Sequence, residues 1–135
     1  TAHRRLKELG ILGINRRNAV CILDRNPRRL YPLVDDKLKM RDLCRRIGVP
    51  TPDIYGEIAC NAQLRHLSTS VGRLNDFVIK PKRGSAGRGI LVIFGRDGDS
   101  FIRHNNERLG LEQIRQHLSD ILSGMYSLGG RPDSA

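Results

Sequence analysis

The sequence lacks features that several protein classes require. It has no tryptophan and only six other aromatic residues among 135. Its three cysteines, Cys21, Cys44 and Cys60, are odd in number and form no C-x-x-C pair, which argues against a disulfide framework or a zinc site. No apolar run exceeds five residues, whereas a membrane helix needs about 20. We therefore expect a soluble, cytoplasmic protein that has no membrane partner.

Acidic residues are also scarce relative to basic ones. There are 14 Asp and Glu against 24 Lys and Arg, which gives a net charge of +10. The charged fraction of 28% is close to the globular average, so the chain is not expected to be disordered. Basic pairs such as Arg4-Arg5, Arg16-Arg17 and Arg28-Arg29 leave open an alternative function, a nucleic-acid- or ribosome-binding module without catalysis. An inert regulatory or scaffold domain is a third possibility.

The chain is long enough for one domain, or for part of a larger one. It begins with Thr1 and ends in the loop-like stretch 127–135, so we expect a fragment of a longer protein. The predicted organisation is a helical segment over 1–50 followed by an α+β region over 51–135.

Hydrophobic periodicity and capping signals predict the helices. We expect helices over 2–9, from Asp35 as the N-cap to Ile47, from Asn61 as the N-cap to Val71, and over 111–124. The stretch 14–24 fits either helix or strand. The prolines at 27 and 32 should break regular structure between these segments.

Short apolar runs predict the strands. We expect strands over 54–59, 76–80, 90–94 and 100–103, with a turn over 95–99. Together with the helices, these strands predict an α+β fold that has a small antiparallel sheet with flanking helices and a glycine-rich hairpin.

The loop between the second and third expected strands has the chemistry of a phosphate site. Glycines at 84, 87 and 89 allow a ligand to approach the backbone closely. Positive charge surrounds them, from Lys80, Lys82, Arg83 and Arg88. Free N–H groups beside lysine suit a polyphosphate, although a glycine-rich basic hairpin is equally well a solvated turn. Since strands lie on both sides, the loop is neither a P-loop nor a Rossmann turn, which run into a helix.

A second lysine favours the phosphate interpretation. Lys37 follows Asp35 and Asp36 at a helix start, where a cation opposes the helix dipole and suits an anionic ligand better than it suits stability. A solvated first-turn lysine is the alternative.

Four segments in this order resemble the ATP-grasp superfamily, most closely the alpha-L-glutamate ligase-like proteins related to the ribosomal-protein glutamate ligases. They are Leu12-Gly-Ile-Asn-Arg-Arg-Asn18, Asn26-Pro-Arg-Arg-Leu-Tyr-Pro-Leu-Val-Asp-Asp-Lys37, Gly48-Val-Pro-Thr-Pro52 and the hairpin from Phe77 to Ile93. The resemblance covers nearly the whole chain, as the N-terminal portion of an ATP-grasp fold. It implies an ATP-dependent carboxylate–amine ligase that acts through an acyl phosphate, with ATP and Mg²⁺ as cofactors. The implied substrates are an amino-acid or peptide carboxylate and an amine acceptor, with a protein as one form of substrate.

The resemblance also implies roles for particular residues. The two lysines that contact phosphate in the family fall on Lys37 and Lys80, with Ile79 beside the adenine. A flexible lid over the β- and γ-phosphates falls on Gly84, Ser85, Ala86, Gly87 and Gly89. The family's hinge acid and magnesium ligands would lie beyond residue 135, so we expect no metal ligand or catalytic residue in this chain, and we expect the chain alone to be inactive.

Other chemically capable side chains have simpler explanations. The four histidines form no pair at helical ligand spacing and are expected at or near the surface. Cys44 belongs to the apolar stripe of its helix. Ser85 lacks the strand-to-helix elbow of a hydrolase serine, so we expect its hydroxyl to donate a hydrogen bond to phosphate. Asp97 and Asp99 suit a hairpin turn better than a metal site.

Overall fold

The computed structural model describes residues 2–127 and 129–135. The chain forms two units, Thr1–Val34 and Asp35–Ala135, which are described separately. The predicted division at residue 50 stays a prediction. No helix in the described part is long and apolar enough to cross a membrane.

The first unit consists of helical segments. They are α1 (Ala2–Glu8), α2 (Ile14–Arg16), the π-helix η1 (Arg17–Leu23) and the 3₁₀-helix η2 (Arg28–Leu30). The sequence left 14–24 open, and the structure makes it helical. A further helix, α3 (Tyr31–Asp35), ends at the first residue of the second unit, so the predicted break at Pro32 is wrong. Proline is tolerated there because the first turn of a helix needs no N–H donor at that position.

The helices of the second unit follow the predicted pattern with shifted ends. They are α4 (Lys37–Arg46), the 3₁₀-helix η3 (Asn61–His66), α5 (Leu67–Val71) and α6 (Leu111–Leu122), with a short 3₁₀ turn, η4 (His104–Asn106). The N-cap of α4 is Asp36 and not Asp35, because the Asp36 carboxylate accepts hydrogen bonds from the N–H groups of Leu38 and Lys39. Cys60, not Asn61, takes the N-cap position of η3, where the Gln63 amide oxygen accepts its N–H.

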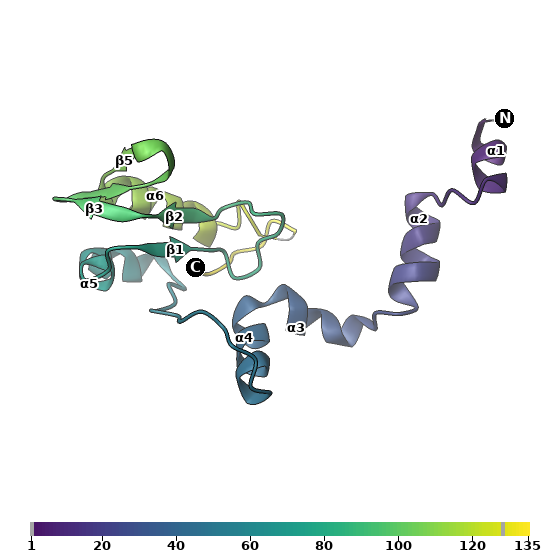
Figure 1. Ribbon diagram of the computed structural model, residues 1–135, viewed down its shortest axis with the longest axis horizontal. Coiled ribbons are helices and arrows are strands. Elements are labelled where there is room, and N and C mark those ends of the chain that lie inside the picture. Colours follow the sequence, from purple (N-terminus) through teal and green to yellow (C-terminus); the bar gives the residue numbers. More distant parts are fainter. Residues whose placement is uncertain (1, 128) are drawn as a thin grey trace. The chain divides into compact units, whose positions relative to one another are not determined.

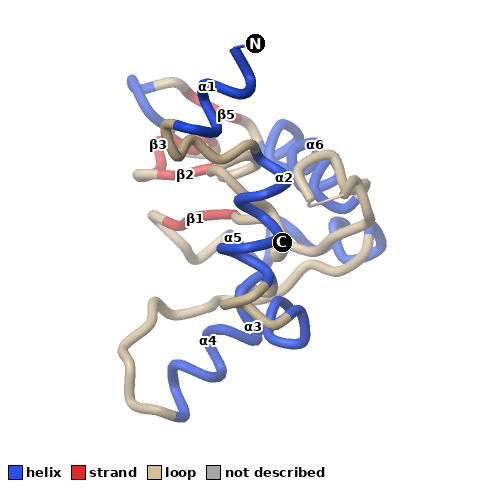
Figure 2. Tube along the Cα trace, turned by 90° about the vertical axis from the view of Figure 1, so that its right-hand side faces the viewer, coloured by secondary structure: helices blue, strands red, loops and turns tan. Residues whose placement is uncertain are grey.

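The strands form two small antiparallel sheets, whereas the sequence predicted one; the α+β class itself is confirmed. β1 (Phe77–Ile79) pairs with β2 (Leu91–Ile93), and β4 (Ser100–Ile102) lies between β3 (Gly95–Asp97) and β5 (Arg108–Leu109). Figure 1 shows β1 and β2 side by side, and Figure 2 shows the strands in red with α6 beside them.

Two strand predictions need correction. No strand forms over 54–59, where only Ile58 is paired, through two backbone hydrogen bonds with Ala135. The stretch 95–99 is not all turn, because its first three residues form β3 and only Gly98 and Asp99 make the turn.

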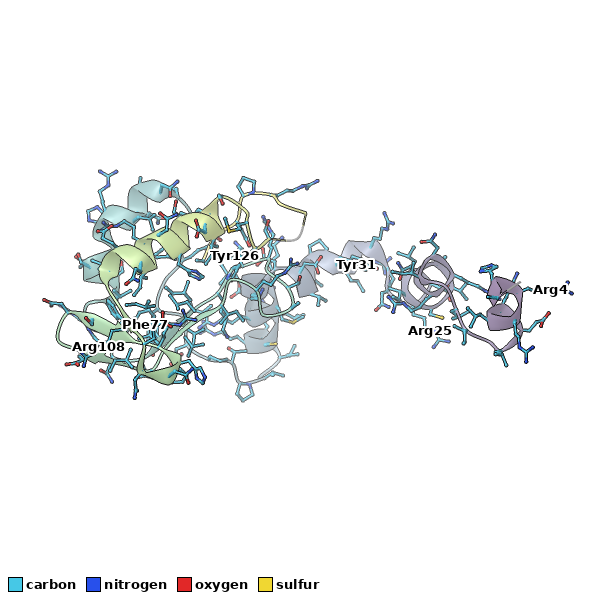
Figure 3. All side chains as sticks on the ribbon, turned by 90° about the horizontal axis from the view of Figure 1, so that it is seen from above. Arg4, Arg25, Tyr31, Phe77, Arg108 and Tyr126 are labelled. Atoms are coloured by element: carbon cyan, nitrogen blue, oxygen red, sulfur yellow. The ribbon has the colours of Figure 1, made fainter. Side chains whose placement is uncertain are left out.

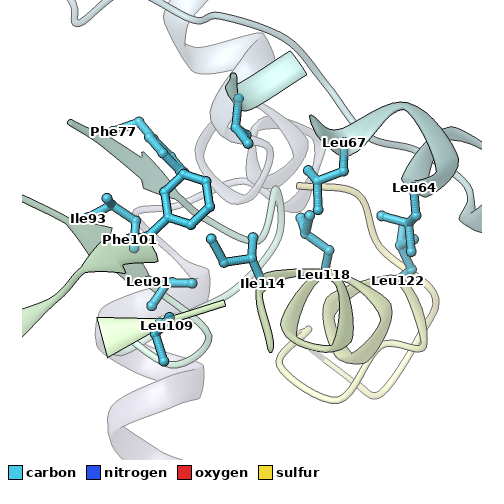
Figure 4. Close-up of a cluster of buried hydrophobic side chains, with 11 residues drawn as sticks. Leu64, Leu67, Phe77, Leu91, Ile93, Phe101, Leu109, Ile114, Leu118 and Leu122 are labelled. Atoms are coloured by element: carbon cyan, nitrogen blue, oxygen red, sulfur yellow. The ribbon is translucent and has the colours of Figure 1, made fainter. Parts of the chain in front are cut away.

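One hydrophobic core joins the sheets to α5, η3 and α6. Phe77 and Phe101 meet edge to face with ring centroids 5.8 Å apart, and Ile114 and Leu118 of α6 are fully covered beside them. Figure 4 shows the two rings facing the side chains of α6. Met125 lies beyond the end of α6 and is 63% exposed, so it does not extend the apolar stripe of the helix. The core holds the β1–β2 hairpin in place, so the glycine-rich loop leaves a rigid base.

Candidate functional site

The glycine-rich loop joins β1 to β2 as a hairpin connection, as predicted. Phe77 lies opposite Ile93 and Ile79 opposite Leu91, so residues 80–90 form the connection. The hairpin itself is confirmed, whereas its closure over a ligand stays a prediction.

The tip of the loop is a tight turn. The Arg88 N–H donates to the carbonyl of Ser85 at 3.1 Å, and both central residues, Ala86 and Gly87, have positive φ angles of 54° and 72°. This is the pattern of a type I′ turn. Nothing lies within 4 Å of the position that a Cβ would take at Gly87, so this part of the loop is open to a ligand.

The other two glycines have packing reasons. A Cβ at Gly84 would lie 2.9 Å from the ring of Pro81, and a Cβ at Gly89 would lie 2.5 Å from Tyr126. Tyr126, labelled in Figure 3, follows α6. Close packing at both ends of the loop therefore explains Gly84 and Gly89 without a ligand, and Gly87 is the glycine that only a turn or a ligand explains.

Lys37 lies at the base of this loop. It is the first residue of α4, and its ammonium donates to the carbonyls of Gly84 at 2.8 Å and Lys82 at 3.3 Å. Its backbone N–H also donates to the Lys82 carbonyl, at 3.2 Å. The start of α4 and the start of the loop, 47 residues apart in the sequence, are thus fastened together.

The Lys37 ammonium also lies near Lys80. Burial is the largest cause that lowers the pKa of Lys37 below 10.5, and the positive charge of Lys80 lowers this pKa further. The carboxylates of Asp133 and Asp36 oppose both effects by raising the pKa. The two lysines that the sequence assigns to one anion are therefore close enough in space to repel each other.

Lys80 differs from Lys37 in its surroundings. Its side chain is exposed, and no described residue accepts a hydrogen bond from its ammonium or forms an ion pair with it. Ile79, just before it, is partly buried against the core. Ser85 is half-buried, and its hydroxyl makes no hydrogen bond to a described residue.

Lys82 does not supply the free positive charge that the sequence suggests. Its ammonium lies 3.0 Å from Glu57 and 3.8 Å from Asp36, so two carboxylates neutralise it. Glu57 also accepts the Ser134 hydroxyl at 2.6 Å. The hydrogen bond from Ser134, and after it the hydrogen bond from Lys82, lower the pKa of Glu57 below 4.5.

Sequence reasoning missed the residues that hold the loop from the C-terminal part of the chain. Asp133 accepts the Arg83 N–H at 2.8 Å, and the Ser134 carbonyl accepts the Lys82 N–H at 2.8 Å. The His117 ring on α6 lies 3.0 Å from the Gly89 carbonyl and against Tyr126. No sequence signal marks these partners, because each lies between 28 and 52 residues from the group it holds.

The predicted site residues are thus partly brought together. Lys37 binds the Gly84 carbonyl and lies near Lys80, and Ser85, Ala86 and Gly87 form the tip of the loop. In the described residues, no group of three His, Cys, Asp or Glu side chains could hold a metal ion.

A hollow of the described surface lies elsewhere. It has a volume of about 420 Å³ and is lined by Arg41, Arg45, Asp53 and residues 48–51, at the C-terminal end of α4. None of the predicted site residues lines it, so it does not bear on the glycine loop.

The comparisons with known proteins agree with the superfamily that the sequence resembles. Residues 16–135 match the model of the sugar-transfer associated ATP-grasp family. No curated protein and no solved structure matches the chain. The match covers the whole second unit and most of the first. Since it spans far more than half of the residues, the chain belongs to the sugar-transfer associated ATP-grasp family.

Proposed function

We propose that this chain supplies ATP-contacting residues of an ATP-dependent carboxylate–amine ligase. The observation that carries the proposal is the meeting of two cationic side chains at one loop. Lys37 binds the loop's first carbonyls, and Lys80 lies close enough to influence it. Two ammonium groups near each other cost energy unless an anion joins them, and a triphosphate is such an anion.

The surroundings of both lysines fit a nucleotide. Lys80 has no partner among the described residues, so its ammonium is available to a phosphate. Lys37 can exchange its two carbonyl acceptors for phosphate oxygens. The open turn at Ala86 and Gly87 would supply backbone N–H groups to the β- and γ-phosphates, and Ile79 would lie beside the adenine.

The chemistry proposed is that of a ligase that forms an acyl phosphate. A carboxylate oxygen attacks the γ-phosphorus, the bond to the bridging oxygen breaks, and ADP leaves. An amine then attacks the acyl carbon, which releases inorganic phosphate and one proton. In that sequence the residues described here hold the triphosphate, and closure of the loop would keep water from the acyl phosphate. Mg²⁺ would accompany ATP and neutralise phosphate charge, and the proposal assigns it no ligand in this chain.

We further propose a glutamate-type substrate, on the resemblance of the four segments quoted above. The family's own description associates it with sugar transfer, so an acceptor that belongs to a glycoconjugate is the second substrate class to test. The proposed ATP site would activate a carboxylate in the same way for either substrate class.

The test compares two lysines of the second unit in the full-length protein. Lys80→Ala removes the proposed phosphate contact, whereas Lys39→Ala removes an exposed lysine of α4 whose ammonium makes no hydrogen bond or ion pair with a described residue. Loss of one charge-assisted hydrogen bond should weaken ATP binding roughly 10- to 150-fold in the first variant and leave it unchanged in the second. Isothermal titration calorimetry measures both.

Equal affinities in the two lysine variants would remove Lys80 from the site. The alternative, a nucleic-acid-binding module, predicts the opposite pattern. RNA would then bind the wild-type protein with a steep salt dependence, and ATP would not bind at all.

A further inference from the structure

Asp133 is a buried carboxylate with one oxygen that has no partner. The residue is only 7% exposed. Its Oδ2 accepts the Arg83 N–H at 2.8 Å, while its Oδ1 is buried and has no hydrogen-bond donor among the described residues. Leaving a carboxylate oxygen buried without a donor is costly, so nearby positive charge is needed to offset that cost.

The same short segment fixes the start of the glycine loop. Asp133 holds the Arg83 N–H, and the adjacent Ser134 carbonyl holds the Lys82 N–H. Lys37 also donates to the carbonyls of Lys82 and Gly84. Residues 82–84 are therefore held by Lys37 at the start of α4 and by Asp133 and Ser134 in the C-terminal segment.

The charges that face Lys37 come from three places. Asp36 precedes it at the helix cap, Lys80 follows β1, and Asp133 lies in the C-terminal segment. Lys82, whose carbonyl Lys37 binds, is itself neutralised by Glu57 and Asp36. Asp36 is shared with Lys82 and with the helix cap, and Asp133 raises the pKa of Lys37 more than Asp36 does.

We propose that Asp133 is a positioning residue of the ATP site: it fixes the first residues of the glycine loop and supplies a negative charge near the Lys37 ammonium, at the point where phosphate would bind. The part that concerns phosphate rests on the proposed function, whereas the part that concerns Lys37 does not. Asp133 acts through Lys37 and the loop and is not itself placed against the nucleotide.

The first experiment needs no nucleotide. Asp133→Asn removes the negative charge and retains an oxygen that can accept the Arg83 N–H. NMR titration of the Lys37 side chain in the full-length protein should show that Lys37 loses its proton at a lower pH in this variant than in the wild type, because a stabilising negative charge has gone. An unchanged Lys37 titration would overturn the inference.

The second experiment follows ATP affinity with pH. ATP affinity should fall more steeply as the pH rises above 7 in Asp133→Asn than in the wild type, because the variant's Lys37 loses its proton at a lower pH. Adding Lys37→Arg to Asp133→Asn should remove this extra pH dependence, because arginine stays protonated over the range. Persistence of the extra pH dependence in the double variant would also overturn the inference.

Asp99→Asn is the matched control, since Asp99 is an exposed acid in the β3–β4 turn. It should match the wild type in both experiments, and thermal unfolding reports whether each variant is folded. Failure of the wild-type protein to bind ATP would overturn the proposed function and with it the phosphate part of this inference. Normal ATP binding with an unchanged pH profile in Asp133→Asn would overturn the inference alone.

Discussion

The two units of the chain contain similar helices but differ in what those helices cover. In 2–34 no residue is buried, and Leu9, Ile14 and Val34 are each about two-thirds exposed. In 35–135 twelve apolar side chains are buried, and α6 alone contributes four of them. A helix as short as α1 is marginal in water without tertiary packing. An apolar sequence pattern therefore specifies a helix in both units, but only the second unit gives that pattern a surface to pack on.

Charge differs between the units in the same way. The first unit has eight Lys or Arg against two Asp or Glu, and its one ion pair among described residues, Arg4 with Glu8, is exposed. Arg4 on α1 and Arg25 in the turn after η1 are both exposed (Figure 3). The second unit has 12 Asp or Glu against 16 Lys or Arg, and its network of Asp36, Glu57 and Lys82 is partly buried. Charge there organises the loop base, whereas in the first unit it keeps the surface solvated.

The sharpest way to break this comparison is to truncate one isoleucine in each unit. Ile114→Ala removes a fully buried side chain from the core and should lower the free energy of unfolding by about 2–5 kcal/mol. Ile14→Ala removes one that is 66% exposed and should change it by less than about 0.5 kcal/mol. Denaturant titration of both variants measures the difference. A loss at Ile14 as large as that at Ile114 would mean that the first unit does pack on something.

Glycine substitutions separate packing from backbone strain in the second unit. Gly87 and Gly89 have the same φ of 72°, but a Cβ at Gly87 meets open space whereas a Cβ at Gly89 collides with Tyr126 and Pro81. Gly87→Ala should cost about 1–2 kcal/mol for the left-handed backbone alone. Gly89→Ala carries that strain plus overpacking of about 1–3 kcal/mol.

Gly10→Ala extends the glycine test to the first unit. Gly10 has a φ of 77° and open surroundings, so its variant should resemble Gly87→Ala in thermal unfolding. Equal costs at Gly87 and Gly89 would contradict the packing explanation for Gly89.

The sequence predicted elements that rest on local patterns. The apolar spacing of α6 and the apolar runs around Phe77 and Ile93 identify elements that the structure contains. Helix and strand patterns of this kind depend only on residues close together in the sequence. The hairpin could be predicted for the same reason, since its strands are neighbours in the chain.

Contacts between residues far apart in the chain could not be predicted from the sequence. Ile58 looked like part of a strand, but its pairing partner is Ala135, so the strand does not extend. β5 is two residues long and exists through pairing with β4. In the candidate site, Lys37 and the loop were predicted from their residue types, whereas Asp133 was not, because its partner Arg83 lies 50 residues earlier. The sequence could not distinguish Asp36 from Asp35 as the N-cap, because both are aspartates and the choice depends on the residue at which α4 begins.

That cap gives a smaller test of how the second unit begins. Asp36→Ala removes two hydrogen bonds to the first turn of α4 and one carboxylate near Lys82. It should lower the free energy of unfolding by about 0.5–2 kcal/mol. Asp35→Ala, at the exposed neighbour that the sequence favoured, should have almost no effect in the same denaturant titration. The reverse order would restore Asp35 as the cap.

The smallest expected effect is a pH dependence that distinguishes paired from solvated acids. The hydrogen bonds from Ser134 and Lys82 lower the pKa of Glu57 below 4.5 in the folded protein, so the folded state binds the Glu57 proton less readily than the unfolded state. The stabilisation is therefore fully present above about pH 4.5 and is lost as pH falls through the folded-state pKa. Glu57→Gln should lack this acid-dependent loss. Because the Glu57 side chain is 37% exposed, the difference between variant and wild type should stay within about 1 kcal/mol.

Glu8→Gln is the counterpart of Glu57→Gln in the first unit, where the Glu8 side chain is 63% exposed. Urea titrations between pH 3 and pH 7 should give this variant the acid dependence of the wild type. If Glu8→Gln flattened the profile as much as Glu57→Gln, solvated ion pairs would contribute as much as the loop network does. The different charge arrangements of the two units would then have no consequence for stability. The carboxylate of Glu57 at the loop base would stabilise the protein no more than the exposed Arg4–Glu8 pair does.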